Sequence, residues 1–334
     1  MKKILNNPGD FVDEMLDGLC AAHPEFYKRT GPAGRVIVRP DAPIAGKVGI
    51  VTGGGSGHLP IFTGYVGKGL LDAAAIGNVF ASPTAEQMAE AMRLAHGGAG
   101  VLRLYGNYGG DVMNFDMAGD FVEMEDIEST TVALADDVVS APSEEKEKRR
   151  GTGGLVYAFK IAGAKAAERA DLMEVTRVAQ KASDACRSIG MALTPCTIPQ
   201  AGKPTFEIAD DEMEMGMGIH GEPGVWRGKL KTADEITDEM FDHLVTDMPI
   251  STGDRISVMV NSLGATPAEE LYIVYARLKG HLDRVGAEII MPLIGRYATS
   301  MEMAGMTMTF CKLDEELEAL LKAPCACAFW RICP

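Results

Sequence analysis

The sequence predicts an α/β protein with two domains, the first a three-layer α/β/α domain with a mostly parallel sheet. Short apolar runs alternate with amphipathic stretches through the first half of the chain, as in successive βα units. The pattern changes near residue 185, and the second half is expected to form a two-layer α/β domain with a mixed sheet. A chain of 334 residues is long enough for two domains, placed at residues 1–185 and 186–334.

The elements of the first half follow from apolar runs and turn residues. Five runs are predicted as strands: Val36–Val38, Val48–Val51, Ala73–Ile76, Val101–Leu104 and Thr131–Ala135. Between them, a helix is predicted to begin with Ser82 as N-cap and Pro83 at its first position, and to end before Gly97. A long helical stretch is expected from Leu155 to about Ile189.

Two capping boxes are predicted to begin helices in the second half. One is formed by Thr232 and Glu235, the other by Thr266 and Glu269 with Pro267 at the first helical position. Strands are expected at Ile256–Val260, Ile289–Met291 and Met306–Phe310. The sequence shows no internal repeat and no low-complexity linker, so the two domains are expected to pack closely.

Composition and charge exclude several classes of function. A formal net charge of −15 opposes binding to nucleic acid and to anionic membrane surfaces. The opening MKKILNNPGDF has no apolar run after its lysines, and no segment reaches the ~18 apolar residues of a membrane span. Seven scattered cysteines indicate a reducing, cytoplasmic compartment. Cys325, Cys327 and Cys333 lack the paired spacing of zinc sites, so no metal is expected and the tail is interpreted as packed or frayed.

The segment SAPSEEKEKRRGTGG, residues 140–154, interrupts the βα pattern with a dense run of charges that ends in glycines. A charge run of this kind is typically a solvated loop. The glycines would also allow a lid or a docking surface, so these readings stay open.

The stretch VTGGGSGHLP places His58 after a strand and a glycine-rich turn. Ligands of open α/β sheets bind at the carboxyl ends of the strands, which is where this turn is expected. The turn matches neither the phosphate-loop pattern nor the dinucleotide fingerprint, so it does not indicate nucleotide binding. Its glycines would let backbone N–H groups approach a small polar ligand beside the imidazole. A structural turn with an incidental histidine is the alternative.

The stretch DEMEMGMGIHGEPG ends in a second candidate, His220. If it is a strand, its methionines share one face with Ile219 and belong to the core, while Gly216, Gly218 and His220 share the other. The two glycines would leave room for a ligand next to the imidazole. A satisfied structural histidine is the alternative.

Asp111 follows a predicted strand and a Gly-Gly turn in LYGNYGGDVMNF. It is expected near the same sheet edge as His58, and the two side chains would form an acid/base pair acting on a substrate hydroxyl. A plain helix N-cap is the alternative for this aspartate.

Taken together, long motifs along the chain resemble a known family. GGGSGH, GYVGKGLLDAA, VFASPTAEQ, NYGGDVMNFDMA, RRG, AGKPTFEIADDEMEMGMGIHGEPG and SVMVNSLGATPAEELY resemble, in order, the dihydroxyacetone-binding subunit of dihydroxyacetone kinases, DhaK. The resemblance implies phosphotransferase activity: the ketone is held as a hemiaminal on a histidine, which corresponds here to His220. A neutral imidazole is a reasonable nucleophile for a carbonyl carbon.

The resemblance also implies the remaining site residues. The family's histidine in GGGSGH and aspartate in NYxGD match His58 and Asp111, which are implied to polarise the adduct and to deprotonate the hydroxyl that receives the phosphoryl group. Gly55 matches a backbone contact to the substrate. The expected substrate contacts are therefore Gly55, Ser56, Gly57, His58, Gly106 and Asp111.

Partners and cofactors are implied by the same resemblance. In the type in which this subunit stands alone, a separate small subunit, DhaL, carries ADP or ATP with Mg²⁺ and is recharged by a phosphotransferase system. This chain is accordingly expected to bind no cofactor itself, to form a homodimer and to work with that nucleotide-binding subunit. The loop around Arg149 and Arg150 is a candidate docking element, from its charge and from the family's RRG.

Two departures from the family pattern leave alternatives open. Gly106 stands where many members have a lysine, and Leu59 stands where they have a glutamate. Extra room at Gly106 would favour a longer ketose such as erythrulose. The departures would also suit a ketose-sensing transcriptional coactivator that transfers no phosphate.

Overall fold

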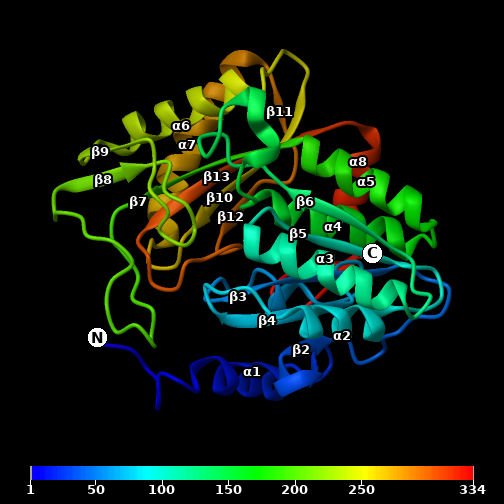
Figure 1. The fold of residues 1–334 in the computed structure, drawn as a ribbon. Coiled ribbons are helices and arrows are strands. Elements are labelled where there is room, and N and C mark those ends of the chain that lie inside the picture. Colours follow the sequence, from blue (N-terminus) through cyan, green and yellow to red (C-terminus); the bar gives the residue numbers. More distant parts are fainter. Residues whose placement is uncertain (1, 334) are drawn as a thin grey trace.

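The computed structural model describes residues 2–333 and builds them around two large sheets (Figure 1). The first sheet has strand order β1-β2-β4-β3-β5-β6. Its strands are β1 (Lys28–Thr30), β2 (Val36–Val38), β3 (Gly49–Ser56), β4 (Ala73–Val79), β5 (Val101–Gly106) and β6 (Ser129–Leu134). The ladders joining β4, β3, β5 and β6 are parallel, whereas β1 and β2 pair antiparallel at one edge.

Helices cover both faces of this sheet because its inner strands are apolar along most of their length and successive side chains point to opposite faces. In β3, Val51 packs in the cluster with α2 and α3, whereas the preceding Ile50 packs in the cluster with α4 and α5. The helices of the first half are α1 (Phe11–Ala22), α2 (Ala85–Ala95), α3 (Gly109–Glu123), α4 (Gly154–Ala167) and α5 (Leu172–Asp184). The predicted three-layer α/β/α arrangement is therefore confirmed.

The second sheet is mixed, as predicted. Antiparallel ladders join β10, β13, β7, β8 and β9, while β11 and β12 pair parallel with β10. Its strands are β7 (Cys186–Ala192), β8 (Glu212–Met215), β9 (Trp226–Lys229), β10 (Arg255–Ser262), β11 (Glu288–Ile289), β12 (Leu293–Gly295) and β13 (Gly305–Leu313). The remaining helices are α6 (Ala233–Asp247), α7 (Ala268–Val285) and α8 (Glu315–Lys322).

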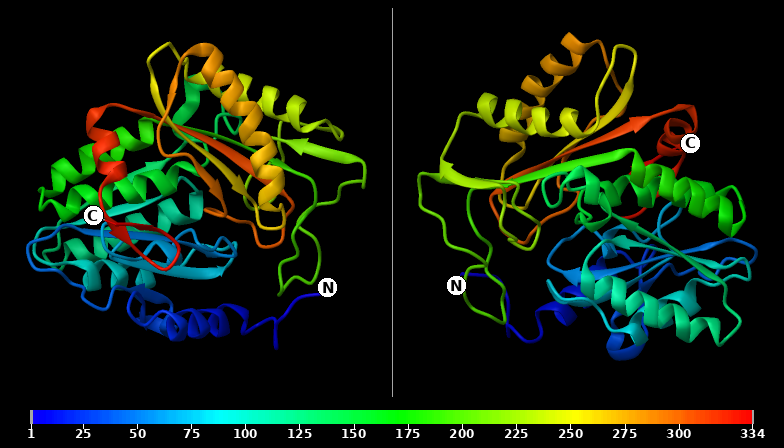
Figure 2. Two further views of the ribbon diagram at one scale, coloured as in Figure 1. Left: turned by 180° about the vertical axis from the view of Figure 1, so that it is seen from behind. Right: turned by 45° about the horizontal axis from the view of Figure 1, so that its top comes forward.

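Helix α4 lies between the two sheets and is buried along residues 154–164. It packs against β3 and β5 of the first sheet and against β7 and β13 of the second. The right panel of Figure 2 shows the resulting order of layers, from α6 and α7 through the second sheet and α4 to the first sheet. The proposed division after residue 185 falls between α5 and β7. One hydrophobic cluster nevertheless runs through both halves, which keeps the two sheets in a fixed relation.

The C-terminal tail returns to the first half of the chain. A short pair of strands, β14 (Cys325–Ala326) and β15 (Arg331–Ile332), sits beside Lys68, whose backbone exchanges hydrogen bonds with Ala326. Cys325 and Cys327 are buried there and Cys333 is exposed. Within residues 2–333 there is no cluster of three metal-binding side chains and no helix long and apolar enough to cross a membrane.

Two predicted helix starts are wrong. Helix α2 is capped by Thr84, whose hydroxyl accepts from the backbone N–H of Gln87 in a capping box. Ser82 instead donates a hydrogen bond to Asp111. Helix α7 takes Pro267 as its N-cap, because the Thr266 hydroxyl accepts from the backbone N–H of Gly305 and donates to the carbonyl of the same residue. The capping box of Thr232 and Glu235 is confirmed.

The long helix predicted from Leu155 to Ile189 is also wrong. The helix is interrupted between α4 and α5, and Asp171 caps α5 by accepting from the backbone N–H of Glu174. The last residues of the predicted helix, up to Ile189, instead belong to β7, the strand that pairs with β13. Pairing within a buried sheet outweighs the weak local preference of this stretch for helix.

Candidate functional site

The two candidate histidines meet at one site, although 162 positions separate them in the sequence. The ring centroids of His58 and His220 lie 4.8 Å apart in an edge-on arrangement. Phe80 stacks on His58 at 4.8 Å, and the ring of Tyr108 stands edge-on to His220 at 4.8 Å. The two imidazoles therefore pack against aromatic rings of the first half of the chain, and His220 joins them from the second half.

His58 follows β3 and is only 1% exposed. Its Nδ1 lies 2.6 Å from the carbonyl oxygen of Thr299, which can only accept, so this nitrogen carries the ring proton. Nε2 then keeps its lone pair, and it is buried with no partner among the described residues. Burial, reinforced by His220, lowers the pKa of His58 to about 3. His58 is accordingly a neutral acceptor near pH 7 and not a donor to a carbonyl oxygen.

The glycines before His58 are required by packing. A Cβ on Gly54 would lie 2.2 Å from the ring of Phe62, and one on Gly55 would lie 2.7 Å from the backbone nitrogen of Ala81. Gly57 adopts a φ of +102°, which side chains rarely tolerate. The Ser56 hydroxyl donates to the carbonyl of Gly77 at 3.0 Å. These contacts hold the loop against β4 independently of any ligand.

His220 lies beyond the end of β8, so the prediction of a strand up to this residue is wrong. The strand ends at Met215 because Gly216 has a φ of +85°, which breaks the pleat. The apolar residues of the stretch are buried as predicted. They divide between two clusters, with Met217 and Ile219 in a small core beneath the turn.

Room that the sequence predicted beside His220 is occupied by protein. A Cβ on Gly218 would lie 2.2 Å from Oε2 of Glu222 and 2.5 Å from Nη1 of Arg150. A Cβ on Gly216 would meet Val225 at 2.7 Å. The space beside both glycines is thus filled by other side chains of the protein, which an alternating sequence pattern cannot reveal.

Glu222 holds His220 in place, and sequence reasoning missed it. Its carboxylate accepts from the backbone N–H of His220 at 2.9 Å and lies 2.8 Å from the imidazole Nδ1. Burial would raise the pKa of Glu222, but the hydrogen bond and charge of His220 outweigh it and lower this pKa to about 2. The ionised carboxylate favours the tautomer with the proton on Nδ1, leaving Nε2 of His220 as a nucleophile. The acid two residues after the histidine in GIHGEPG was the available signal.

Asp111 lies in the first turn of α3 and is 8% exposed. Its N-cap alternative is wrong, because the N-cap position belongs to Tyr108. The Ser82 hydroxyl donates to Asp111 Oδ1 at 2.5 Å. Burial raises the pKa of Asp111 to about 6, with Ser82 and His220 partly opposing the shift. A carboxylate with this pKa is well suited to accept a proton near neutral pH.

Gly106 ends β5 and has no open space beside it. A Cβ there would lie 3.2 Å from the carbonyl oxygen of Gly151 and 3.3 Å from the ring of Tyr108. A Cβ at this position would be tightly surrounded, and a preference for a longer ketose stays a prediction. The Tyr108 hydroxyl is buried without a hydrogen-bond partner among residues 2–333.

Arg149 does not present its charge to a partner, whereas the charge run before it does lie on the surface. Residues 142–148 are exposed, but the Arg149 side chain is only 2% exposed and forms two hydrogen bonds to Asp247. Arg150 turns toward the His220 loop, where its Nη1 lies 3.9 Å from Oε2 of Glu222. Sequence reasoning noted the arginine pair but not these intramolecular contacts.

The site thus combines three chemical capacities in one place. His220 has an imidazole whose Nδ1 is held by a carboxylate, His58 has a buried acceptor nitrogen without a partner among residues 2–333, and Asp111 has a carboxylate whose pKa is raised to about 6. A nucleophile beside two proton acceptors can add to an electrophilic carbon and activate a neighbouring hydroxyl.

Comparison with known proteins identifies the family of the chain. The chain is 41% identical to the dihydroxyacetone-binding subunit DhaK of PTS-dependent dihydroxyacetone kinase 2 from Listeria innocua, covering 99% of this chain and 100% of that protein. It is 42% identical to L-erythrulose 1-kinase of Mycolicibacterium smegmatis, covering 97% of this chain and 57% of that longer protein.

Solved structures give the same result. The dihydroxyacetone kinase of C. freundii superposes with a TM-score of 0.90 at 30% identity, covering 99% of this chain and 60% of that chain. The dihydroxyacetone kinase operon co-activator Dha-DhaQ superposes with a TM-score of 0.88 at 30% identity, covering 95% and 98%. The Dak1 domain model matches residues 17–329, and the chain therefore belongs to the Dak1 domain family.

Proposed function

We propose that this protein is the ketose-binding subunit of a dihydroxyacetone kinase, which captures dihydroxyacetone as a hemiaminal on His220 and presents its hydroxyl for phosphorylation. The observation that carries the proposal is the meeting of His220, with Glu222 on its Nδ1, and the unpartnered Nε2 of His58. Relatives named as dihydroxyacetone kinase subunits support the choice of substrate.

In the capture step, Nε2 of His220 donates its lone pair to the carbonyl carbon. The π electrons of the carbonyl move to oxygen, which takes up a proton from solvent, and the positive charge left on the ring faces the Glu222 carboxylate. The new hydroxyl of the adduct can donate a hydrogen bond to Nε2 of His58. Glycerol lacks a carbonyl carbon and would not be captured.

In the transfer step, a terminal hydroxyl of the adduct attacks the donor phosphorus. Asp111 accepts the proton of this hydroxyl as the new O–P bond forms and the bond to the leaving oxygen breaks. The raised pKa of Asp111, about 6, leaves it ionised at pH 7 while keeping it a stronger base than an exposed aspartate.

The phosphoryl donor is proposed to be a nucleotide with Mg²⁺ carried by a separate subunit, DhaL. Relatives of matching length are described as subunits of PTS-dependent kinases, which supports a division of labour between chains. The site's own residues then supply binding, orientation and proton acceptance. The homodimer remains part of the proposal.

Two other functions have specific support. Similarity to L-erythrulose 1-kinase favours a kinase for a longer ketose. Superposition on the co-activator Dha-DhaQ favours a ketose sensor. A sensor needs the capture step but has no use for a proton acceptor at Asp111.

The test is a carbon NMR spectrum of dihydroxyacetone labelled at its carbonyl carbon, mixed with the protein. A bound tetrahedral-carbon signal, distinct from that of the free hydrate, is expected for the wild type and for Asp111→Asn. Adding the nucleotide-carrying subunit should then convert the wild-type adduct to dihydroxyacetone phosphate. Absence of the signal with both dihydroxyacetone and erythrulose would overturn the proposal, and capture without transfer would favour the sensor.

A further inference from the structure

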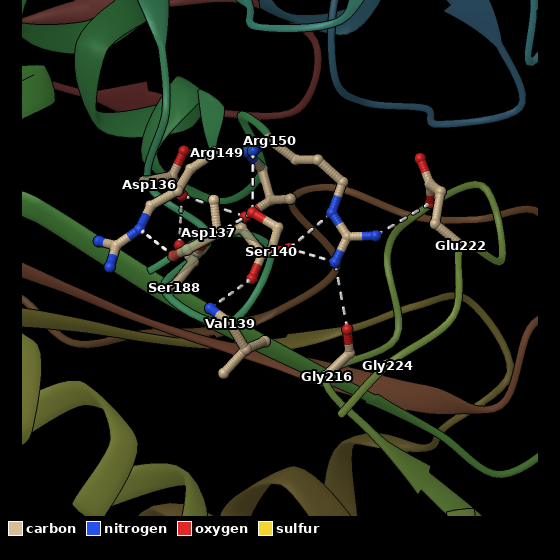
Figure 3. A network of polar contacts seen from close by, with 12 residues as sticks. Asp136, Asp137, Val139, Ser140, Arg149, Arg150, Ser188, Gly216, Glu222 and Gly224 are labelled. Atoms are coloured by element: carbon tan, nitrogen blue, oxygen red, sulfur yellow. Dashed lines mark hydrogen bonds and ion pairs between the residues drawn. The ribbon is translucent and has the colours of Figure 1, made fainter. Parts of the chain in front are cut away.

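Arg150 connects the segment after β6 to the turn that carries His220 (Figure 3). On one side its Nε donates to Asp137 Oδ2 at 3.0 Å, and its backbone N–H donates to the Ser140 hydroxyl at 3.0 Å. Asp137 returns a backbone hydrogen bond to the carbonyl of Arg150 at 3.0 Å. Asp137 is 2% exposed, so the guanidinium is anchored to a buried carboxylate, while the backbone of Arg150 is held separately by Ser140 and by the Asp137 N–H.

On its other side, Arg150 reaches the His220 turn at two points. Nη2 donates to the carbonyl of Gly216 at 3.2 Å, and Gly216 is the first residue after β8. Nη1 lies 3.9 Å from Oε2 of Glu222, the oxygen that accepts from the backbone N–H of His220. The missing side chain of Gly218 is what lets the guanidinium and this carboxylate approach each other.

We propose that Arg150 is a positioning residue that acts through Glu222, holding its carboxylate at Nδ1 of His220 so that Nε2 stays free to attack the ketone. The inference rests on the proposed function, because it takes His220 as the nucleophile. Arg150 contacts neither His220 nor any reacting atom, and its effect passes through the Gly216 carbonyl and the Glu222 carboxylate.

The planar guanidinium is suited to this task. Its three nitrogens reach acceptors in two separate segments at once, which the single ammonium of a lysine cannot reproduce. Its neighbour provides a control, because Arg149 lies in the same segment and is more deeply buried, with a side chain 2% exposed against 15% for Arg150, but bonds to Asp247 and Ala141. Arg149→Lys therefore removes a buried guanidinium without touching the His220 turn.

The experiment compares Arg150→Lys, Arg149→Lys and wild type, each labelled with nitrogen-15 in histidine. Nitrogen chemical shifts of His220 in the ketose-free protein report its tautomer, and carbonyl-labelled dihydroxyacetone reports the affinity of the adduct. Arg150→Lys should lose the single Nδ1-protonated form and bind the ketose about 10-fold more weakly, the lower end of what one hydrogen bond to a charged group contributes. Arg149→Lys should keep the wild-type tautomer and adduct, whatever its melting temperature.

The outcomes separate this inference from the proposed function. Wild-type His220 shifts and adduct affinity in Arg150→Lys would overturn the positioning role, and so would equal losses in both lysine variants. If wild type forms no adduct, the proposed function fails, but the tautomer comparison in ketose-free protein still decides whether Arg150 sets the state of His220.

A third variant, Arg150→Gln, keeps hydrogen-bond donors but carries no charge. Its ketose affinity should lie between those of Arg150→Lys and wild type if hydrogen bonding to Gly216 is the larger contribution. A ketose affinity of Arg150→Gln below that of Arg150→Lys would instead assign the larger part of the effect to the ion pair with Glu222.

Discussion

The two histidine loops of the site are held in different ways. The His58 loop is held by backbone: a carbonyl fixes the tautomer, and glycines pack against the neighbouring chain. The His220 loop is held by side chains, with Glu222 on the imidazole and Arg150 behind it. His58 is almost fully buried, whereas the His220 side chain is 24% exposed. A rigid acceptor thus faces an accessible nucleophile, and single substitutions can act on the second far more easily than on the first.

The largest difference between the two loops is expected for His220→Ala. Removing the nucleophile should abolish the tetrahedral-carbon signal completely, since His58, the other imidazole of the site, is almost fully buried, whereas the His220 ring is the accessible one. His58→Ala serves as the control and should retain a detectable adduct. An adduct that persists in His220→Ala would show that the roles of the two loops have been assigned the wrong way round.

The next largest effect is expected for Asp111→Asn. Asp111, like His58, comes from the first half of the chain. The variant keeps the shape of the side chain but cannot accept a proton, so phosphoryl transfer with the partner subunit should fall by about 100- to 10,000-fold. Capture should remain, as measured by carbon NMR. Equal loss of capture and transfer would mean that Asp111 supports binding and not proton transfer.

Glu222→Gln tests the side-chain support of His220. An amide can donate to Nδ1, which would move the ring proton to Nε2 and block the nucleophile. Ketose affinity should fall by about 10- to 100-fold, the value of one hydrogen bond to a charged group. Titration of labelled dihydroxyacetone measures this loss. An unchanged affinity would leave Glu222 as a structural residue of the turn.

A smaller effect is expected from pH. Asp111 must be ionised to act as a base, and burial raises its pKa to about 6, so activity should be full above this pH and fall below it. At pH 5, kcat/KM should be about tenfold below its plateau. The pKa of His58 is lowered to about 3, so His58 should add no second step near pH 6.5. If the residual activity of Asp111→Asn falls at acidic pH in the same way as that of the wild type, the fall must come from the titration of another group.

Ser82→Ala should give the smallest change. The Ser82 hydroxyl donates to the ionised carboxylate of Asp111, so its loss should raise the pKa of Asp111 further. The acidic limb of the pH profile should move upward by up to about one pH unit, with little change in the plateau. Thr84→Ala is a matched control, because Thr84 caps α2 without touching Asp111. A downward shift in Ser82→Ala would contradict this account of the hydrogen bond.

Local sequence determined the elements that carry the site. Apolar runs placed β3 and β5, whose carboxyl ends lead to His58 and Asp111, because alternation and run length are properties of neighbouring residues. Glycine after Met215 stopped β8 before His220, and this was missed because the alternating apolar pattern continues past the break. Local patterns also misplaced the cap of α2, since Ser82 has a partner in α3 that its own neighbours do not reveal.

What the sequence determined by itself is therefore the fold class and the residue types available for chemistry. Only the tertiary structure decided how they work together: the carbonyl of Thr299 reaches His58 from 241 positions away and sets its neutral tautomer. Arg150 likewise reaches Gly216 across 66 positions. The physical reason is that pKa and tautomer depend on burial and on hydrogen-bond partners, and at this site partners from both halves of the chain are brought together by packing the two sheets about α4.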